Sequence, residues 1–155
     1  MNVLLREITD HDISLVLAWR NHPDVMKGIY SQRNGHSITW EEHYKWWTTR
    51  HNWRRWIIRV NDGVTTRDVG CVSVANLDSW CPEIGFFLGE TTLWGKGVAT
   101  QAVKLAMQWL KEMGYECVRT TVLKDNESSM KLLKRQGFEI VHTAREGEWY
   151  VEAKL

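Results

Sequence analysis

The sequence predicts an α+β (α/β) fold in which a mixed, mostly antiparallel sheet of about seven strands carries four helices, divided between its two faces. The apolar period changes along the chain from helical to alternating and back, which gives the order β, α, α, β, β, β, α, β, α, β, β. This order contains one strand-helix-strand unit. One parallel pair of strands is therefore expected among antiparallel neighbours.

The first elements are a strand and a helix. Apolar residues predict a strand over residues 4–8. Thr9 or Asp10 is a suitable N-cap for the helix that follows, because both side chains accept hydrogen bonds from free backbone N–H groups. This helix must end before Pro23, since the residue preceding a proline is pushed out of the helical conformation.

A second helix is predicted after Thr39. Thr39 and Glu42 have the spacing of a capping box, in which each side chain satisfies a backbone N–H of the other residue. We expect the helix to run through Trp47 towards Arg50.

The remaining elements follow from the apolar spacing. Strands are expected at residues 56–60, 69–75, 83–88, 117–123, 139–143 and 148–155. A long helix begins at Gly97, where apolar residues recur every three or four positions until Gly114, and a shorter one covers residues 126–136. No repeat or linker divides the chain, so residues 1–155 are expected to form a single domain.

Composition excludes several classes of protein. The net charge is +1, from 20 basic and 19 acidic residues, so the broad basic surface of a nucleic-acid-binding protein is not expected.

The three cysteines are odd in number and widely spaced, which argues against disulfides and structural zinc and favours a reducing cytoplasm. The six histidines show no metal-ligand spacing, and no apolar stretch has the length of a membrane span. Ten tryptophans are an excess that calls for an explanation.

Glycines gather where the strand ending at Leu88 passes to the helix beginning at Gly97. Gly95 and Gly97 allow backbone N–H groups to approach an anion at the positive end of the helix dipole. The spacing of a P-loop is absent, and a dinucleotide fingerprint lacks its third glycine, because Thr100 stands there. A phosphate cradle and a plain turn without a ligand both remain open on this pattern alone.

Two sequence blocks resemble the GNAT superfamily of acetyltransferases. Residues 94–99 are similar to its loop Arg/Gln-x-x-Gly-x-Gly/Ala at Gly97 and Ala99, with Trp94 in the first position, as in the ribosomal-protein N-acetyltransferase-like branch. Residues 126–138 resemble its helix Asn-x-x-Ser/Ala-x-x-Leu-Tyr-x-Lys-x-Gly-Phe. The resemblance implies a GNAT-like fold, acetyl-CoA as the acetyl donor, and N-acetyltransferase activity on an amine.

The resemblance also implies the binding site for acetyl-CoA. Backbone N–H groups of the glycine loop are expected to hold the pyrophosphate, and the edge of the strand at residues 86–88 is expected to pair with the pantetheine arm. The expected cofactor-binding residues are Phe87, Leu88, Trp94, Gly95, Lys96, Gly97, Val98, Ala99, Thr100, Asn126 and Ser129. Lys131, Lys134 and Arg135 either reach the ribose phosphate or form an ordinary solvated helix face.

Acetyl transfer to an amine requires a base, an oxyanion donor and a proton for the departing thiolate. Glu83, at the start of the central strand, is the expected base, acting through a water; a purely structural ion pair is the alternative. The backbone N–H of Leu88 is the oxyanion donor that the resemblance implies. Leu133 stands where many GNAT enzymes place a tyrosine that acts as the general acid. The proton for the thiolate therefore comes from Ser129 or a water, or the thiolate leaves without protonation.

The resemblance implies that the first two helices and the last hairpin choose the acceptor. Trp19-Arg20-Asn21 and Thr39-Trp40-Glu41-Glu42-His43 resemble signatures of the aminosugar N-acetyltransferases of the pseudaminic acid pathway, which acetylate a nucleotide-linked amino sugar. The expected substrate-binding residues are Arg20, Asn21, Trp40 and Trp47, with aromatic rings stacking on a base or sugar. Core packing or a homodimer surface is the alternative for the tryptophans. A protein N-terminus as acceptor, and a non-catalytic acyl-CoA-binding module, also remain open.

Overall fold

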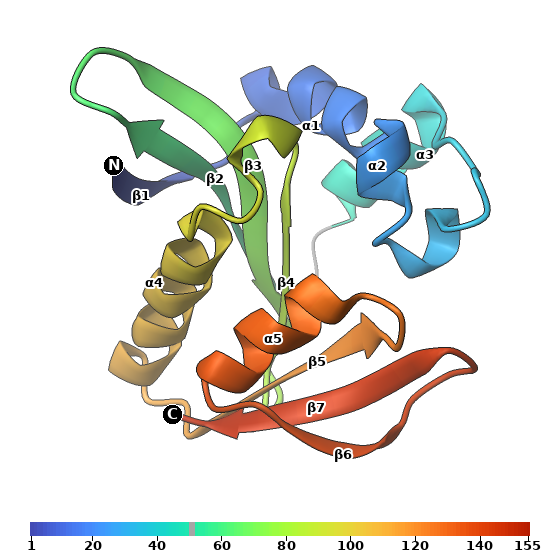
Figure 1. The fold of residues 1–155 in the computed structure, drawn as a ribbon, viewed down its shortest axis with the longest axis vertical. Coiled ribbons are helices and arrows are strands. Elements are labelled where there is room, and N and C mark those ends of the chain that lie inside the picture. The colour runs from blue at the N-terminus through green and yellow to red at the C-terminus, as the bar shows by residue number, and fades with distance from the viewer. Residues whose placement is uncertain (50–51) are drawn as a thin grey trace.

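Seven strands form one twisted sheet in the computed structural model, which describes residues 1–49 and 52–155 (Figure 1). The strand order is β1-β2-β3-β4-β5-β7-β6, and every pair is antiparallel except β4 and β5. The strands are β1 (Asn2–Glu7), β2 (Arg54–Asn61), β3 (Thr66–Ala75), β4 (Glu83–Leu88), β5 (Cys117–Leu123), β6 (Glu139–Thr143) and β7 (Glu148–Lys154). The predicted mixed sheet of seven strands is confirmed.

Five α-helices flank this sheet within the described part of the chain, one more than predicted. They are α1 (Ile13–Arg20), α2 (Pro23–Met26), α3 (Trp40–Thr48), α4 (Val98–Glu112) and α5 (Glu127–Arg135), with short 3-10 turns η1 (Asp10–Asp12), η2 (Tyr30–Gln32) and η3 (Thr91–Leu93). The additional helix α2 begins at Pro23, because the fixed φ of proline suits the first helical position. Thr39 and Glu42 form the predicted capping box of α3. The predicted end of that helix, towards Arg50, lies outside the described residues.

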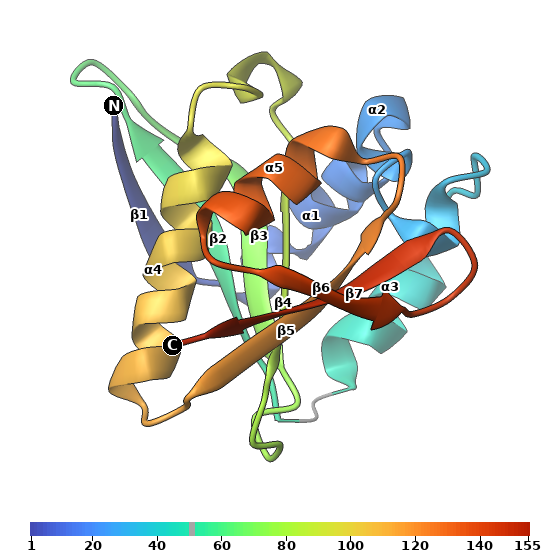
Figure 2. The same ribbon diagram turned by 60° about the horizontal axis from the view of Figure 1, so that its bottom comes forward.

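The two faces of the sheet have separate cores. Helices α4 and α5 cover one face, and α1 to α3 cover the other (Figure 2). In β2, Trp56 and Ile58 pack on the side of α4, whereas Ile57 packs between α1 and α3. Alternate residues of β4 divide in the same way, with Phe86 on the first side and Phe87 on the second. No helix among the described residues is long and apolar enough to cross a membrane.

An ion-pair network ties β1 to the start of the helical layer. Arg6 donates to both carboxylate oxygens of Asp12, at 2.9 and 2.7 Å, and to Asp68 at 2.8 Å. Hydrogen bonding from Arg6 holds the pKa of Asp12 below its ordinary value. Burial alone would raise the pKa of Asp68. Hydrogen bonds from Arg59 and Arg6 have the larger combined effect, so the pKa of Asp68 is lowered.

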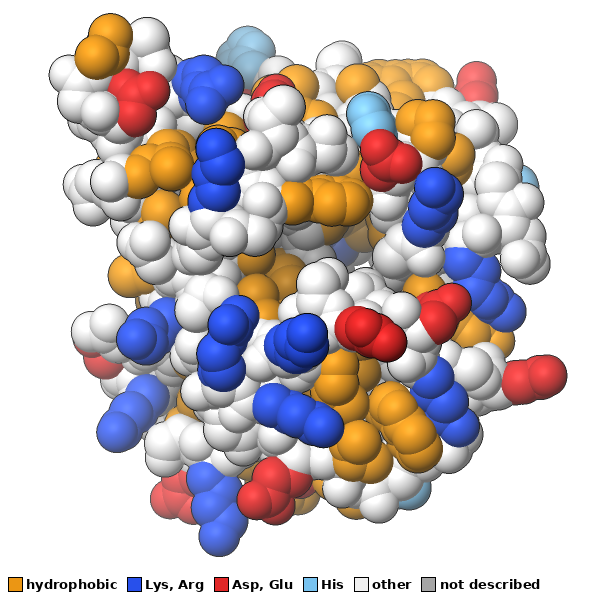
Figure 3. Space-filling view, in the orientation of Figure 1, with side chains coloured by type: hydrophobic (Ala, Val, Ile, Leu, Met, Phe, Trp, Pro, Cys, Tyr) orange, Lys and Arg blue, Asp and Glu red, His pale blue; other side chains and the backbone are white. Residues whose placement is uncertain are grey.

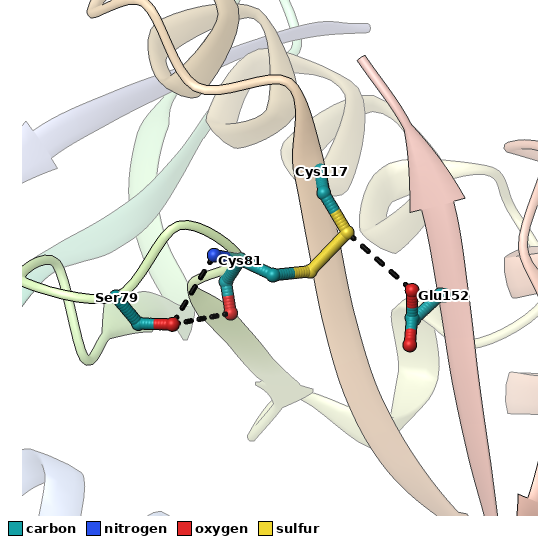
Figure 4. Close-up of a disulfide and its surroundings, with 4 residues drawn as sticks. All are labelled: Ser79, Cys81, Cys117 and Glu152. Atoms are coloured by element: carbon teal, nitrogen blue, oxygen red, sulfur yellow. Dashed lines mark hydrogen bonds between the residues drawn. A yellow bond between two sulfur atoms is a disulfide. The ribbon is translucent and has the colours of Figure 1, made fainter.

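The expectation that no disulfide forms is wrong. Cys81 and Cys117 are joined, and both are buried (Figure 4). Cys81 lies two residues before β4 and Cys117 begins β5, so the parallel pairing of these strands brings the two residues together at the N-terminal ends of both strands. Cys71 is the odd cysteine: it is buried, and burial raises its pKa to about 12. A count of cysteines could not reveal this pairing, because the strand order creates it.

Glu152 is the polar neighbour of this disulfide. Its Oε1 lies 3.5 Å from Cys117 Sγ, and its carboxylate and the two sulfurs fall within 4.8 Å of one another (Figure 4). A sulfur in a disulfide has no proton to donate, so this contact becomes a hydrogen bond only when the thiol is reduced. The disulfide also removes the thiolates that a metal would bind. The absence of a metal stays a prediction.

Candidate active site

The site is built where the two parallel strands separate. β4 pairs with β5 only at Glu83 and Arg119, and the Arg119 N–H donates to the Pro82 carbonyl at 2.9 Å. The other edge of β4 is paired with β3 over its whole length. Because the strands diverge beyond Glu83, the edge of β4 that faces β5 is left open, and a cleft passes through the sheet there.

This cleft has a volume of about 430 Å³ and reaches both faces of the sheet. Figure 3 shows it as a hollow between η3 and α5. Residues of α5 line it on one side, and residues from the α1–α3 layer line it on the other. The lining residues include Arg20, Tyr30, Trp46, Glu83, Phe87, Asn126, Ser129, Leu133, Arg145 and Glu148.

The glycine loop lies beside the open end of β4. Gly95 and Gly97 have φ values of 77° and 80°, a left-handed conformation that favours glycine. Backbone N–H groups from residue 95 to residue 100 have no backbone acceptor within the described ranges, and the first such bond of α4 is donated by Gln101 to Gly97. These N–H groups lie at the positive end of the α4 dipole, as an anion-binding cradle requires.

Trp94 fixes the loop to the strand. Its indole N–H donates to the Leu88 carbonyl at 3.1 Å, while about half of the side chain stays exposed. The Gly89 N–H donates to Val69 at 2.8 Å in β3, and such bonded positions alternate along an antiparallel pair. The N–H and C=O of Leu88 therefore point away from β3, towards the open edge. This is the direction that an oxyanion donor needs.

Helix α5 brings its N-terminus to the cleft. The Asn126 side chain caps the helix by accepting from the Ser129 N–H at 3.3 Å, and the Ser128 hydroxyl donates to the same oxygen at 3.2 Å. Ser129 and Leu133 both line the cleft. Leu133 is almost fully buried there, so this side of the cleft has an apolar group at the position of the usual tyrosine.

On the opposite side lies Glu83. Alternation along β4 directs it, like Phe87, towards the α1–α3 layer. It is partly buried and lines the cleft. Its expected role as base stays a prediction.

The expected substrate-binding pair Arg20 and Asn21 separates. Arg20 lines the cleft, with its guanidinium 5.3 Å from the centre of the Trp46 ring, and burial lowers its pKa. No hydrogen bond to this guanidinium occurs among the described residues. Asn21 instead holds the following connection, because its side chain bonds both the N–H and the C=O of Ile38, at 2.8 and 2.9 Å.

The two expected tryptophans lie away from the cleft. Trp40 is half exposed and stacks on Tyr44, with ring centres 6.1 Å apart. Trp47 is buried, and its indole N–H donates to Asp10 at 2.6 Å. Trp46, which lies between them in sequence, is the tryptophan of α3 that lines the cleft.

Among the residues of the cleft wall that sequence reasoning missed, three carry polar groups from late or irregular parts of the chain. Tyr30 comes from η2, Arg145 from the turn between β6 and β7, and Glu148 from the first position of β7. No motif marks them. Glu148 is 3% exposed, whereas the nearby Glu146 is exposed to solvent, and this difference depends on the tertiary structure.

Comparisons with known proteins agree with this geometry. Residues 2–139 match the family model of the GNAT acetyltransferase domain. The protein MJ1062 of Methanocaldococcus jannaschii is 40% identical over 153 residues, which cover 99% of this chain but only 31% of that protein. Acetyltransferase PseH of Campylobacter jejuni is 23% identical over 86% of this chain and 81% of its own length. The aminoglycoside acetyltransferase AAC(6')-Ib, solved with coenzyme A, superposes with a TM-score of 0.81 at 18% identity, covering 99% of this chain and 95% of that one.

Proposed function

This chain belongs to the GNAT acetyltransferase family, and from that premise we propose that residues 1–155 form a domain that transfers an acetyl group from acetyl-CoA to the amine of a nucleotide-linked amino sugar. The chain spans about a third of MJ1062, so the proposal concerns this domain alone. One observation carries it. A cleft runs through the sheet at the open edge of β4, and its wall holds both a carboxylate, Glu83, and a guanidinium that makes no hydrogen bond among the described residues, Arg20.

The charges favour this acceptor over a polyamine. A nucleotide-linked amino sugar carries an ammonium group and a diphosphate, which complement Glu83 and Arg20 respectively. A polyamine has no anion for Arg20, and a partly buried cation would repel it. The similarity to PseH supports the same substrate class.

The residues divide the chemistry among them. Acetyl-CoA supplies the acetyl thioester, and the cradle from Gly95 to Thr100 would hold its pyrophosphate. Glu83 takes the proton of the acceptor ammonium through a water, so that a neutral amine attacks. The Leu88 N–H stabilises the oxyanion that develops on the acetyl carbonyl. Leu133 supplies no proton, and Ser129, a hydroxyl of the cleft wall, donates one to the departing thiolate.

Three further expectations belong to this proposal. The reaction is placed in the cytoplasm, where acetyl-CoA is available, with no nucleic acid, membrane or metal taking part. The Cys81–Cys117 disulfide argues in the other direction, because cytosolic disulfides are rare. Counting free thiols in protein trapped directly from cells decides this point. A homodimer is the third expectation, and sedimentation of the pure protein tests it.

The function is tested with the pure protein, acetyl-CoA and a panel of amines, by following thiol release. The panel contains a UDP-4-amino sugar, an N-terminal peptide and spermine. We expect turnover on the UDP-4-amino sugar. Preferential turnover on the peptide would favour an N-terminal acetyltransferase, and thermal stabilisation by acetyl-CoA without turnover on any amine would favour an acyl-CoA-binding module.

A further inference from the structure

Glu148 is a buried carboxylate in the wall of the cleft. It begins β7 opposite Leu123 of β5, and its side chain is only 4% exposed. Trp149, the next residue, packs on the side of α4 and α5. Alternation therefore directs Glu148 to the α1–α3 face, the face to which Glu83 also points.

One oxygen of this carboxylate is held and the other is not. The Arg145 Nε donates to Glu148 Oε1 at 2.7 Å. Oε2 receives no hydrogen bond from any described residue. It is not among the fully buried polar atoms that lack a partner, so it remains accessible from the cleft. A buried carboxylate is costly unless its charge and lone pairs are satisfied, so an open Oε2 in a cleft wall is suited to receive a donor from a ligand.

Arg145 is itself held in place. Its guanidinium lies 3.8 Å from the centre of the Tyr30 ring, and Arg33 lies at the same distance from that ring. The pKa of Arg145 is raised, first by its hydrogen bond with Glu148 and, among smaller contributions, by the charge of Glu83. Arg145 thus stands beside two carboxylates, those of Glu148 and Glu83.

Resting on the proposed function, we propose that Glu148 binds the ammonium group of the acceptor, together with Glu83 across the cleft. Arg145 positions the Glu148 carboxylate, and Tyr30 positions Arg145. Arg20, which lines the same cleft, then receives the anionic part of the acceptor. The cleft therefore selects acceptors that carry both an amine and an anion.

The test compares Glu148→Gln with Glu146→Gln, an exposed glutamate two residues away in the same turn. With the UDP-4-amino sugar as acceptor, Glu148→Gln is expected to raise the acceptor KM about tenfold or more, since a hydrogen bond to a charged group is lost. Stabilisation by acetyl-CoA should not change, and Glu146→Gln should behave as the wild type.

A second measurement separates binding of the charge from a loss of shape. The matching UDP-4-hydroxy sugar is used as a competitive inhibitor, and the wild type is expected to bind the amine in preference to this neutral analogue. Glu148→Gln should lose that preference. If Glu148→Gln does not fold, Glu148→Asp replaces it, with a raised KM expected because the carboxylate withdraws by one methylene.

The outcomes distinguish this inference from the proposed function. Wild-type turnover with an unchanged acceptor KM and preference in Glu148→Gln would overturn the role of Glu148 alone. Wild-type protein that acetylates no amine in the panel would overturn both.

Discussion

The disulfide between Cys81 and Cys117 is predicted to supply much of the stability of the domain. It closes a loop with a sequence separation of 36 residues and so restricts the unfolded chain. The loop-closure relation gives a stabilisation of about 4 kcal/mol for that length. For a urea m-value of about 2 kcal/mol/M, the unfolding midpoint should fall by about 2 M when the bond is lost.

Urea unfolding with and without a reductant measures this effect. The reductant should lower the midpoint of the wild type but leave Cys81→Ala, which has already lost the bond, unchanged. Alkylation of the unreduced, denatured wild type should label one thiol, that of Cys71. Labelling of all three cysteines, or coincident midpoints with and without the reductant, would refute the reasoning.

Three other predictions concern the loop, the base and acid stability. Gly97→Glu should abolish thermal stabilisation by acetyl-CoA, because a side chain at a φ of 80° strains the loop and a carboxylate would repel the pyrophosphate; unchanged stabilisation would argue against the cradle. Glu83→Gln should lower kcat and remove the acidic limb of the pH-rate profile, and an unaltered profile would exclude Glu83 as the base. The pKa values of Asp12 and Asp68 are lowered by folding, so their stabilising contribution is present above the unfolded value of about 4 and lost as the pH falls through the folded values. Arg6→Met should therefore cost about 3 kcal/mol at neutral pH and less at pH 2, as urea midpoints at the two pH values would show.

Local patterns in the sequence were sufficient for most of the architecture. The change of apolar period predicts the seven strands, because successive side chains of a strand point to opposite faces of the sheet, as the alternation of Trp56, Ile57 and Ile58 between the two cores shows. The capping box at Thr39 and the glycines before α4 act through their own backbone neighbours, so their structures could be predicted without a tertiary contact. Helix α2 was missed, since four residues are too few to show a period.

The composition of the site depended on contacts that no local pattern records. Three tryptophans of α3 have the same chemistry, yet Trp40 is exposed, Trp46 lines the cleft and Trp47 is buried against Asp10. The burial of each tryptophan depends on whether its side of α3 faces the sheet, the cleft or solvent.

The sequence by itself determined the order of the elements, the loop that suits an anion and the family resemblance. The tertiary structure alone decided the disulfide and the burial of Glu148. Both depend on β5, which lies between β4 and β7 in the sheet although β4 precedes α4 and β7 ends the chain. Strand order is set by long-range packing, so residues far apart in sequence acquire their chemistry only when the sheet forms.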